Sequence, residues 1–97
     1  MANLVVSYPR HEGARFDADY YRDTHIPLVE RAWGPVGMTG AQILWPADNA
    51  QPHAAMVVLS FASSAAIDAA LGSPATPEVL GDVAKFTDIQ PVIYRTL

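Results

Sequence analysis

Four short apolar segments and two segments of helical pattern make up most of this chain, and their order restricts the folds open to it. The apolar segments are rich in β-branched residues and are bounded by proline or polar residues, which is typical of strands. They cover residues 4–8, 41–45, 56–61 and 92–96. The helical segments follow the first and the third of these. The resulting β-α-β-β-α-β order predicts a ferredoxin-like α+β fold with an antiparallel sheet, as one domain over residues 1–97.

The first helix is expected from about residue 18 to Trp33. Asp17 precedes it and is suited to be its N-cap, and Phe16 is placed to pack against Tyr21. Aromatic and apolar residues fall on one side of the helical wheel and acidic residues on the other. One face of this helix is therefore expected in the core and the other in water.

Pro27 interrupts the pattern of the first helix. It lacks the N–H that would bond the carbonyl of Asp23, and it disfavours α geometry at the residue before it. A kink near His25 is therefore expected. Gly34 and Pro35 are expected to end the helix, with Gly34 in the C′ position.

The second helical segment is divided by Gly72 and Pro74. Ser63 is the expected N-cap of a short helix that ends at Leu71. Thr76 is the expected N-cap of another, which continues to about Lys85 before the last strand.

Both faces of the expected sheet carry apolar residues. Leu4 and Val6 fall on one face of the first strand, but Val5 falls on the other, and Met56 and Val58 repeat this on the third strand. The chain is 51% hydrophobic and only 16% charged, so too few charged residues are present to cover a small monomer. We expect a second copy of the chain to pack its sheet against this one in a two-fold homodimer.

Charge and cysteine content exclude several classes of function. Six basic and ten acidic residues give a net charge of −4, which leaves no basic surface for nucleic acid or anionic membranes. The chain contains no cysteine, so thiol catalysis and thiolate metal sites are excluded. No long apolar span and no leader pattern is present, so a cytoplasmic protein is expected. The three histidines lack metal-binding spacing, and neither a metal nor a cofactor is expected.

His25 is the sharpest candidate for chemistry. An imidazole beside a proline kink can titrate near neutral pH and face a cleft, where it would serve as a general acid or base. Tyr21 lies one turn earlier on the same side and is the candidate partner in proton transfer. The alternative is that His25 bonds a backbone carbonyl freed by Pro27 and only holds the kink.

A further group of large apolar residues could line a ligand pocket. Two tryptophans in so short a chain each lie next to a proline or Gly-Pro break, where they could form the mouth of an apolar site. The alternative is that these residues belong to the core. The candidates for ligand binding are Tyr20, Leu28, Trp33, Trp45, Phe61 and Phe86.

Two segments resemble the EthD family. Residues 16–29 follow its pattern "FD-x-D-YY" and then "TH-x-PLV", and residues 33–37 fit the continuation. Residues 81–88 resemble the family's second recognisable block. The resemblance implies a dimeric α+β barrel of two ferredoxin-like subunits. It also implies that His25 and Tyr21 carry the motif's function.

The resemblance implies less about activity. EthD is named from a gene cluster for ethyl tert-butyl ether degradation, and similar domains in polyketide pathways look like cofactor-free dehydratases. One hypothesis is a cofactor-independent enzyme that acts on a small hydrophobic metabolite with His25 as acid or base. A second is a non-catalytic protein that holds such a metabolite for a degradative oxygenase system. The third is a structural dimer without a ligand.

Overall fold

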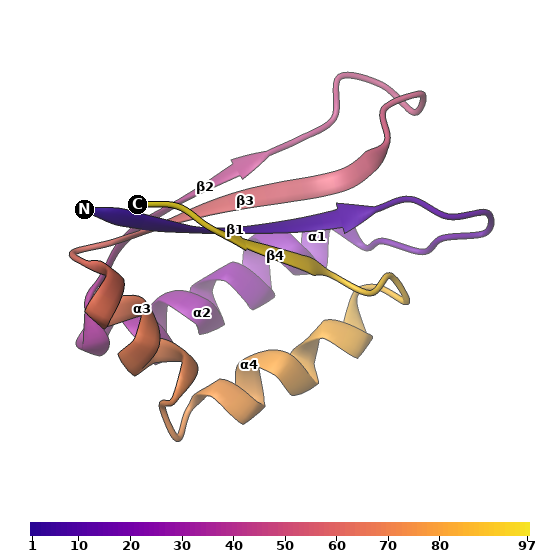
Figure 1. The fold of residues 1–97 in the computed structure, drawn as a ribbon. Coiled ribbons are helices and arrows are strands. Elements are labelled where there is room, and N and C mark those ends of the chain that lie inside the picture. Colours follow the sequence, from indigo (N-terminus) through magenta and orange to yellow (C-terminus); the bar gives the residue numbers. More distant parts are fainter.

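The structure, a computed structural model that describes all residues 1–97, is a four-stranded antiparallel sheet with every helix on one face (Figure 1). The order of strands in the sheet is β2-β3-β1-β4. The strands are β1 (Ala2–Pro9), β2 (Met38–Leu44), β3 (His53–Phe61) and β4 (Val92–Arg95). The predicted ferredoxin-like fold is confirmed. Strands β1 to β3 begin earlier than predicted because backbone pairing continues through residues such as Asn3 and Gly40 that carry no strand pattern.

The first helical segment is continuous from residue 18 to 33 but changes its winding. It consists of α1 (Ala18–Tyr20), a π-helical turn η1 (Tyr21–His25) and α2 (Ile26–Trp33). Asp17 caps it as predicted, since its side chain accepts a hydrogen bond from the backbone N–H of Tyr20. The interruption expected from Pro27 takes the form of this wider turn, in which the N–H of Ile26 bonds the carbonyl of Tyr21.

Gly34 does not end the helix in the C′ role, contrary to the prediction. It keeps right-handed geometry and opens a 3₁₀ turn, η2 (Gly34–Val36), that Pro35 can join because its fixed φ suits a helical first turn. The residue with left-handed geometry is Gly37, at φ 116°. The helical winding therefore continues to Val36, three residues beyond the expected end at Trp33.

The second helical segment forms α3 (Ser64–Leu71), α4 (Thr76–Asp82) and a 3₁₀ turn η3 (Val83–Lys85). The Ser63 cap is confirmed, because its hydroxyl accepts from the N–H of Ala66. Thr76 is wrong as an N-cap: it is the first residue of α4 and is buried. Its hydroxyl donates to the carbonyl of Ala70 and accepts a bond of 3.0 Å from the indole N–H of Trp33.

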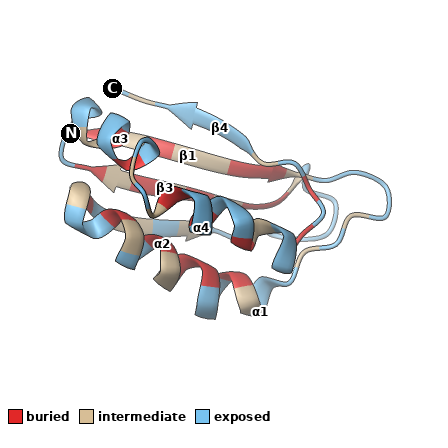
Figure 2. Cartoon of the chain, turned by 90° about the horizontal axis from the view of Figure 1, so that it is seen from below, coloured by how far each residue is buried: buried red, intermediate tan, exposed pale blue.

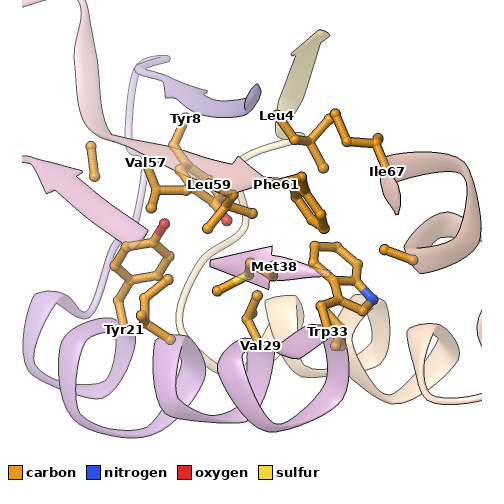
Figure 3. Close-up of a cluster of buried hydrophobic side chains, with 14 of the residues drawn as sticks. Leu4, Tyr8, Tyr21, Val29, Trp33, Met38, Val57, Leu59, Phe61 and Ile67 are labelled. Atoms are coloured by element: carbon orange, nitrogen blue, oxygen red, sulfur yellow. The ribbon is translucent and has the colours of Figure 1, made fainter. Parts of the chain in front are cut away.

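The core lies between the helices and one face of the sheet. The buried sides of the helices all turn toward the strands (Figure 2), and the close-up in Figure 3 shows Leu4, Val57, Leu59 and Phe61 of the sheet meeting Trp33 and other helical side chains. Full burial of a side chain of this size contributes about 1.5–3 kcal/mol. This layer therefore fixes how the helices dock on the sheet.

The other face of the sheet has no covering element. In the antiparallel register Val5 lies between Val58 of β3 and Tyr94 of β4, so these three side chains share that face. Tyr94 is 67% exposed, and Val92 and Leu44 on the same face are 51% and 42% exposed. The expected second apolar face is therefore present. None of the helices combines the length and the apolar character needed to cross a membrane.

Candidate functional site

The π turn places Tyr21 and His25 one above the other. Their rings stack with centroids 5.6 Å apart and planes 20° from parallel. Both residues are buried, His25 with 3% of its surface exposed. The predicted same-side arrangement of the two is therefore present in the structure, on the face of the helix that packs toward the sheet.

His25 bonds a carboxylate that is far away in the sequence. Its Nδ1 lies 2.9 Å from Oδ2 of Asp82, at the end of α4. Tyr20 donates a hydrogen bond of 2.8 Å to the other oxygen, Oδ1. The ammonium group of Lys85, which is exposed, is 3.8 Å from the same oxygen. The alternative in which His25 bonds a backbone carbonyl freed by Pro27 is wrong, because Asp82 occupies its Nδ1.

The electrostatics of this group favour a neutral imidazole beside an ionised carboxylate. Burial lowers the pKa of His25 below its usual value, and the bond to Asp82 only partly opposes this. Burial alone would raise the pKa of Asp82, but hydrogen bonds from His25 and Tyr20 and the charge of Lys85 bring it below its usual value. Since the carboxylate can only accept, Nδ1 of the neutral ring carries the proton. Nε2 then presents a free lone pair, and no other side chain bonds it.

Aromatic rings surround His25 and Tyr21. Phe86 lies 4.6 Å from the His25 ring, and Tyr8 of β1 meets Tyr21 edge to face at 5.4 Å. The Tyr21 hydroxyl points from the helix toward the sheet (Figure 3) and is buried without a hydrogen-bond partner. Burial raises the pKa of Tyr21 far above its usual value and that of Tyr8 to about 12, so both phenols remain protonated. Each is a potential donor to an oxygen atom of a ligand.

A cavity of about 60 Å³ lies beside these residues, between the sheet, α2 and α4. Of the 16 residues that line it, 14 are hydrophobic, and none is Lys, Arg, Asp or Glu. His25, Tyr21 and Tyr8 contribute polar groups to an otherwise apolar wall. The arrangement can accept or donate one proton at Nε2 and donate hydrogen bonds from two phenols, in a space that excludes most water.

The structure brings only some of the expected ligand residues to this cavity. Trp33 lines it, but Tyr20 does not and is linked to it only through Asp82 and His25. Phe61 packs on Trp33 at 6.2 Å within the core, and Phe86 packs behind His25. The remaining two do not line it: Leu28 is half-buried against the core, and Trp45 is 42% exposed beyond β2.

Sequence reasoning missed two residues of the site, Asp82 and Tyr8. Asp82 is 57 positions from His25, so no spacing rule connects them. Its position in the second motif block, directly after Gly81, was the available signal. Tyr8 had the pattern of an ordinary strand residue. No group of three His, Asp or Glu side chains lies close enough to hold a metal ion.

Comparisons with known proteins identify relatives. The sequence model of the EthD domain matches residues 12–90. The crystal structure of an EthD-like protein from Ralstonia eutropha JMP134 is 34% identical, with a TM-score of 0.81 over 98% of this chain and 88% of that one. No match was found among curated proteins.

Two more distant structures share the fold alone. A dimeric ferredoxin-like protein of unknown function from Jannaschia sp. CCS1 is 18% identical, with a TM-score of 0.66 over 99% of this chain and 96% of that one. SnoaB, a cofactor-independent oxygenase from Streptomyces nogalater, is 10% identical, with a TM-score of 0.65 over 96% of this chain and 89% of that one.

Proposed function

The chain belongs to the EthD family, and on this premise we propose that it is a homodimeric, cofactor-independent enzyme that transfers a proton on a small hydrophobic metabolite. Nε2 of His25 is the general base, and its conjugate acid returns the proton. The hydroxyl of Tyr21 stabilises the negative charge that develops on an oxygen of the substrate. Tyr8 contributes a second phenol to the same cavity.

One observation carries this proposal: a histidine that lines an apolar cavity, with one ring nitrogen bonded to a buried carboxylate and no side chain bonded to the other. The carboxylate holds the tautomer and orientation of the ring, and it stabilises the imidazolium that forms when Nε2 takes a proton. A residue that served only to hold a helix would not need an unpaired nitrogen on the cavity side.

The buried hydroxyl of Tyr21, which lies close to the Tyr8 phenol but makes no regular hydrogen bond, supports the same conclusion. A buried donor without an acceptor costs about 1–3 kcal/mol, so most buried hydroxyls are paired. Tyr21 remains protonated across the physiological range because burial raises its pKa. It can therefore donate to a carbonyl or enolate oxygen at the moment when His25 removes a proton from the neighbouring carbon.

Exchange of hydrogen for deuterium tests the proposal without knowledge of the natural substrate. The probe is 2-indanone, an uncharged ring ketone whose α-protons exchange in D₂O and are followed by NMR. We expect the protein to accelerate exchange and His25→Asn to reduce the acceleration by about 10²-fold or more, since general base catalysis contributes about 10²–10⁴. Asn keeps a donor for Asp82 but has no basic nitrogen.

Glu78→Ala is the matched control, since this exposed side chain lies outside the cavity and away from the open sheet face, and it should leave the rate unchanged. Equal rates for the wild type and His25→Asn would exclude His25 as the base. Saturable binding of 2-indanone without exchange would instead favour the accessory role, in which the protein holds a metabolite for a degradative oxygenase.

The homodimer in this proposal forms through the open face of the sheet. That face places Val5, Val58 and Tyr94 together without cover, and a distant structural neighbour is described as dimeric. Two such sheets packed face to face would remove the exposed apolar side chains from water. The cavity lies on the opposite, helical side of the sheet, so it would remain accessible in the dimer.

A further inference from the structure

The cavity at His25 is too small for a ring in the form that the structure shows. Its volume is about 60 Å³, whereas a cavity of about 150 Å³ is known to enclose benzene. A substrate larger than a few atoms therefore needs one wall of the cavity to open. The position of that wall decides how a ligand enters and which ligands fit.

A second hollow lies next to the cavity and shows where this wall is. It lies between α4, η3 and residues 87–91, is open to solvent, and has a volume of about 480 Å³. Leu80, Val83 and Pro91 line both spaces. These three side chains therefore separate the His25 cavity from the solvent-filled hollow. Ile93 of β4 also lines the cavity and is 52% exposed, so it lies at the same border.

The elements on this side are the least secured part of the cavity wall. Strand β4 has four residues, all exposed, and pairs only with β1 because it is the edge of the sheet. Figure 1 shows α4 lying below β4, each at the margin of its layer. The opposite walls are the central strands β1 and β3 and the long helical segment that ends in α2. No hydrogen bond joins α4 to β4, whereas Asp82 and Thr76 bond α4 to His25 and Trp33, so movement of β4 away from α4 would open the wall and keep the site intact.

The charges around the cavity select against ions. No charged side chain lines it, and transfer of an unpaired ion into such a space is costly. The ionised Asp82 lies directly behind His25 and would repel an anion. The cation Lys85 is 67% exposed and does not line the cavity. The polar groups that do line it, one imidazole and two phenols, match a single hydroxyl or carbonyl oxygen.

We propose that an uncharged ring molecule with one hydroxyl or carbonyl oxygen enters the His25 cavity between α4 and β4, and that Leu80 sets the largest ring system admitted. Leu80 is 58% exposed and lines both the His25 cavity and the neighbouring hollow. This proposal rests on the proposed function for the identity of the site, but it concerns entry and selection.

The first experiment tests charge selection with two single-ring probes of similar size, phenol and benzoate. Each is titrated into ¹⁵N-labelled protein at pH 7 while the imidazole signals of His25 are followed by NMR. We expect phenol to shift these signals saturably and benzoate to bind at least about tenfold more weakly. Benzoate binding as tight as phenol binding, or no effect of phenol on His25, would overturn the proposal.

The second experiment tests the entrance through the ratio of affinities for 2-naphthol and phenol. Leu80→Ala should raise this ratio about tenfold and Leu80→Phe should lower it, because a pocket wall discriminates ligands mainly by size. Glu78→Ala is the matched control: Glu78 is an exposed residue of α4 that lines neither space, and its ratio should not change. A ratio that is the same in all four proteins would refute the role of Leu80.

The two proposals fail in distinguishable ways. If Leu80 controls binding of the naphthol but 2-indanone does not exchange, the entrance stands and catalysis by His25 is refuted. If exchange depends on His25 but neither ligand binding nor exchange responds to Leu80, the proposed function stands and the entrance is refuted. Because Leu80 is exposed, we expect both of its variants to fold.

Discussion

Asp82 is the residue on which the chemical state of His25 depends. A carboxylate at Nδ1 forces the neutral ring into the tautomer with a free Nε2, whereas an amide there can donate its own hydrogen and reverse the tautomer. We expect Asp82→Asn to fold and to lower the rate of 2-indanone exchange by about 10²-fold or more. The measurement that separates positioning from mere stability is the ¹⁵N shift of the two ring nitrogens. An unchanged tautomer in the variant would contradict this role.

The buried imidazole also predicts how stability depends on pH. The pKa of His25 is lowered in the folded protein, so between that value and 6.5 the unfolded chain binds a proton that the folded one does not. Stability should therefore fall as pH drops below about 6.5 and should stop falling from this cause once the folded pKa is passed. Chemical denaturation at several pH values would measure this change in the free energy of unfolding. In His25→Asn this part of the pH dependence should disappear.

Asp82 adds a separate loss of stability at lower pH. Its pKa in the folded protein is below the usual value of 3.8, so its contribution is present above that pH and is lost as pH falls through the folded pKa. His25→Asn should retain this second loss. The loss from His25 begins near pH 6.5 and the loss from Asp82 only below about pH 3.8, which allows the two residues to be distinguished.

The sequence alone was enough to predict two residues of the site, His25 and Tyr21. His25 and Tyr21 are neighbours on one helix, so periodicity alone placed them together. Asp82 could not be found this way, because its contact depends on how α4 docks across the sheet. The exposure of Trp45 could not be predicted from the sequence either, since it depends on the length and path of the β2–β3 hairpin.

Among the elements, the junction between the first helical segment and β2 is the most constrained. Gly37 has φ 116°, and a Cβ atom there would lie 2.6 Å from the Cβ of Ala66 in α3. We expect Gly37→Ala to destabilise the protein by about 1–3 kcal/mol or more through backbone strain and this clash. Denaturant titration checks it, with Gly40→Ala as the control, because nothing lies within 4 Å of that position. Equal stability of the two variants would contradict the assignment.

The location of this junction shows what local sequence rules omit. Both Gly34 and Gly37 are suitable places for a helix to end, and the Gly-Pro pair favoured the first. In the structure the α-helix ends at Trp33, as this pair predicted, but a 3₁₀ turn that tolerates Pro35 near its start continues the winding to Val36, and the left-handed residue is Gly37. Similarly, Pro27 predicted an interruption, but only the packing of Tyr21 and His25 shows that it takes the form of a π turn.

For the whole molecule, the open sheet face predicts self-association. We expect a dimer at micromolar concentration in sedimentation experiments, and Tyr94→Lys should weaken it by at least about tenfold, because a charge would replace a large apolar contact at that face. Arg31→Lys, a conservative change of an exposed residue of α2 on the helical side, is the control. A wild-type monomer at this concentration would refute the dimer.

The architecture was predictable because it depends on the order of segments and on which of their faces are apolar. Connections between elements must be short and must not cross, and under these conditions the β-α-β-β-α-β order allows few arrangements. The cavity was not predictable in this way. Its walls come from β1, β3, β4, α2 and α4, so its volume results from how well side chains such as Trp33 and Leu80 fill the space between layers.

The indole of Trp33 also has an optical consequence. Trp33 is 4% exposed and lines the cavity, whereas the other tryptophan, Trp45, is 42% exposed and does not line it. In a Trp45→Phe variant the protein's fluorescence would come from a single indole in an apolar environment at the ligand site. The emission of this one side chain would then change as the cavity fills, so the molecule carries its own unlabelled sensor of occupancy.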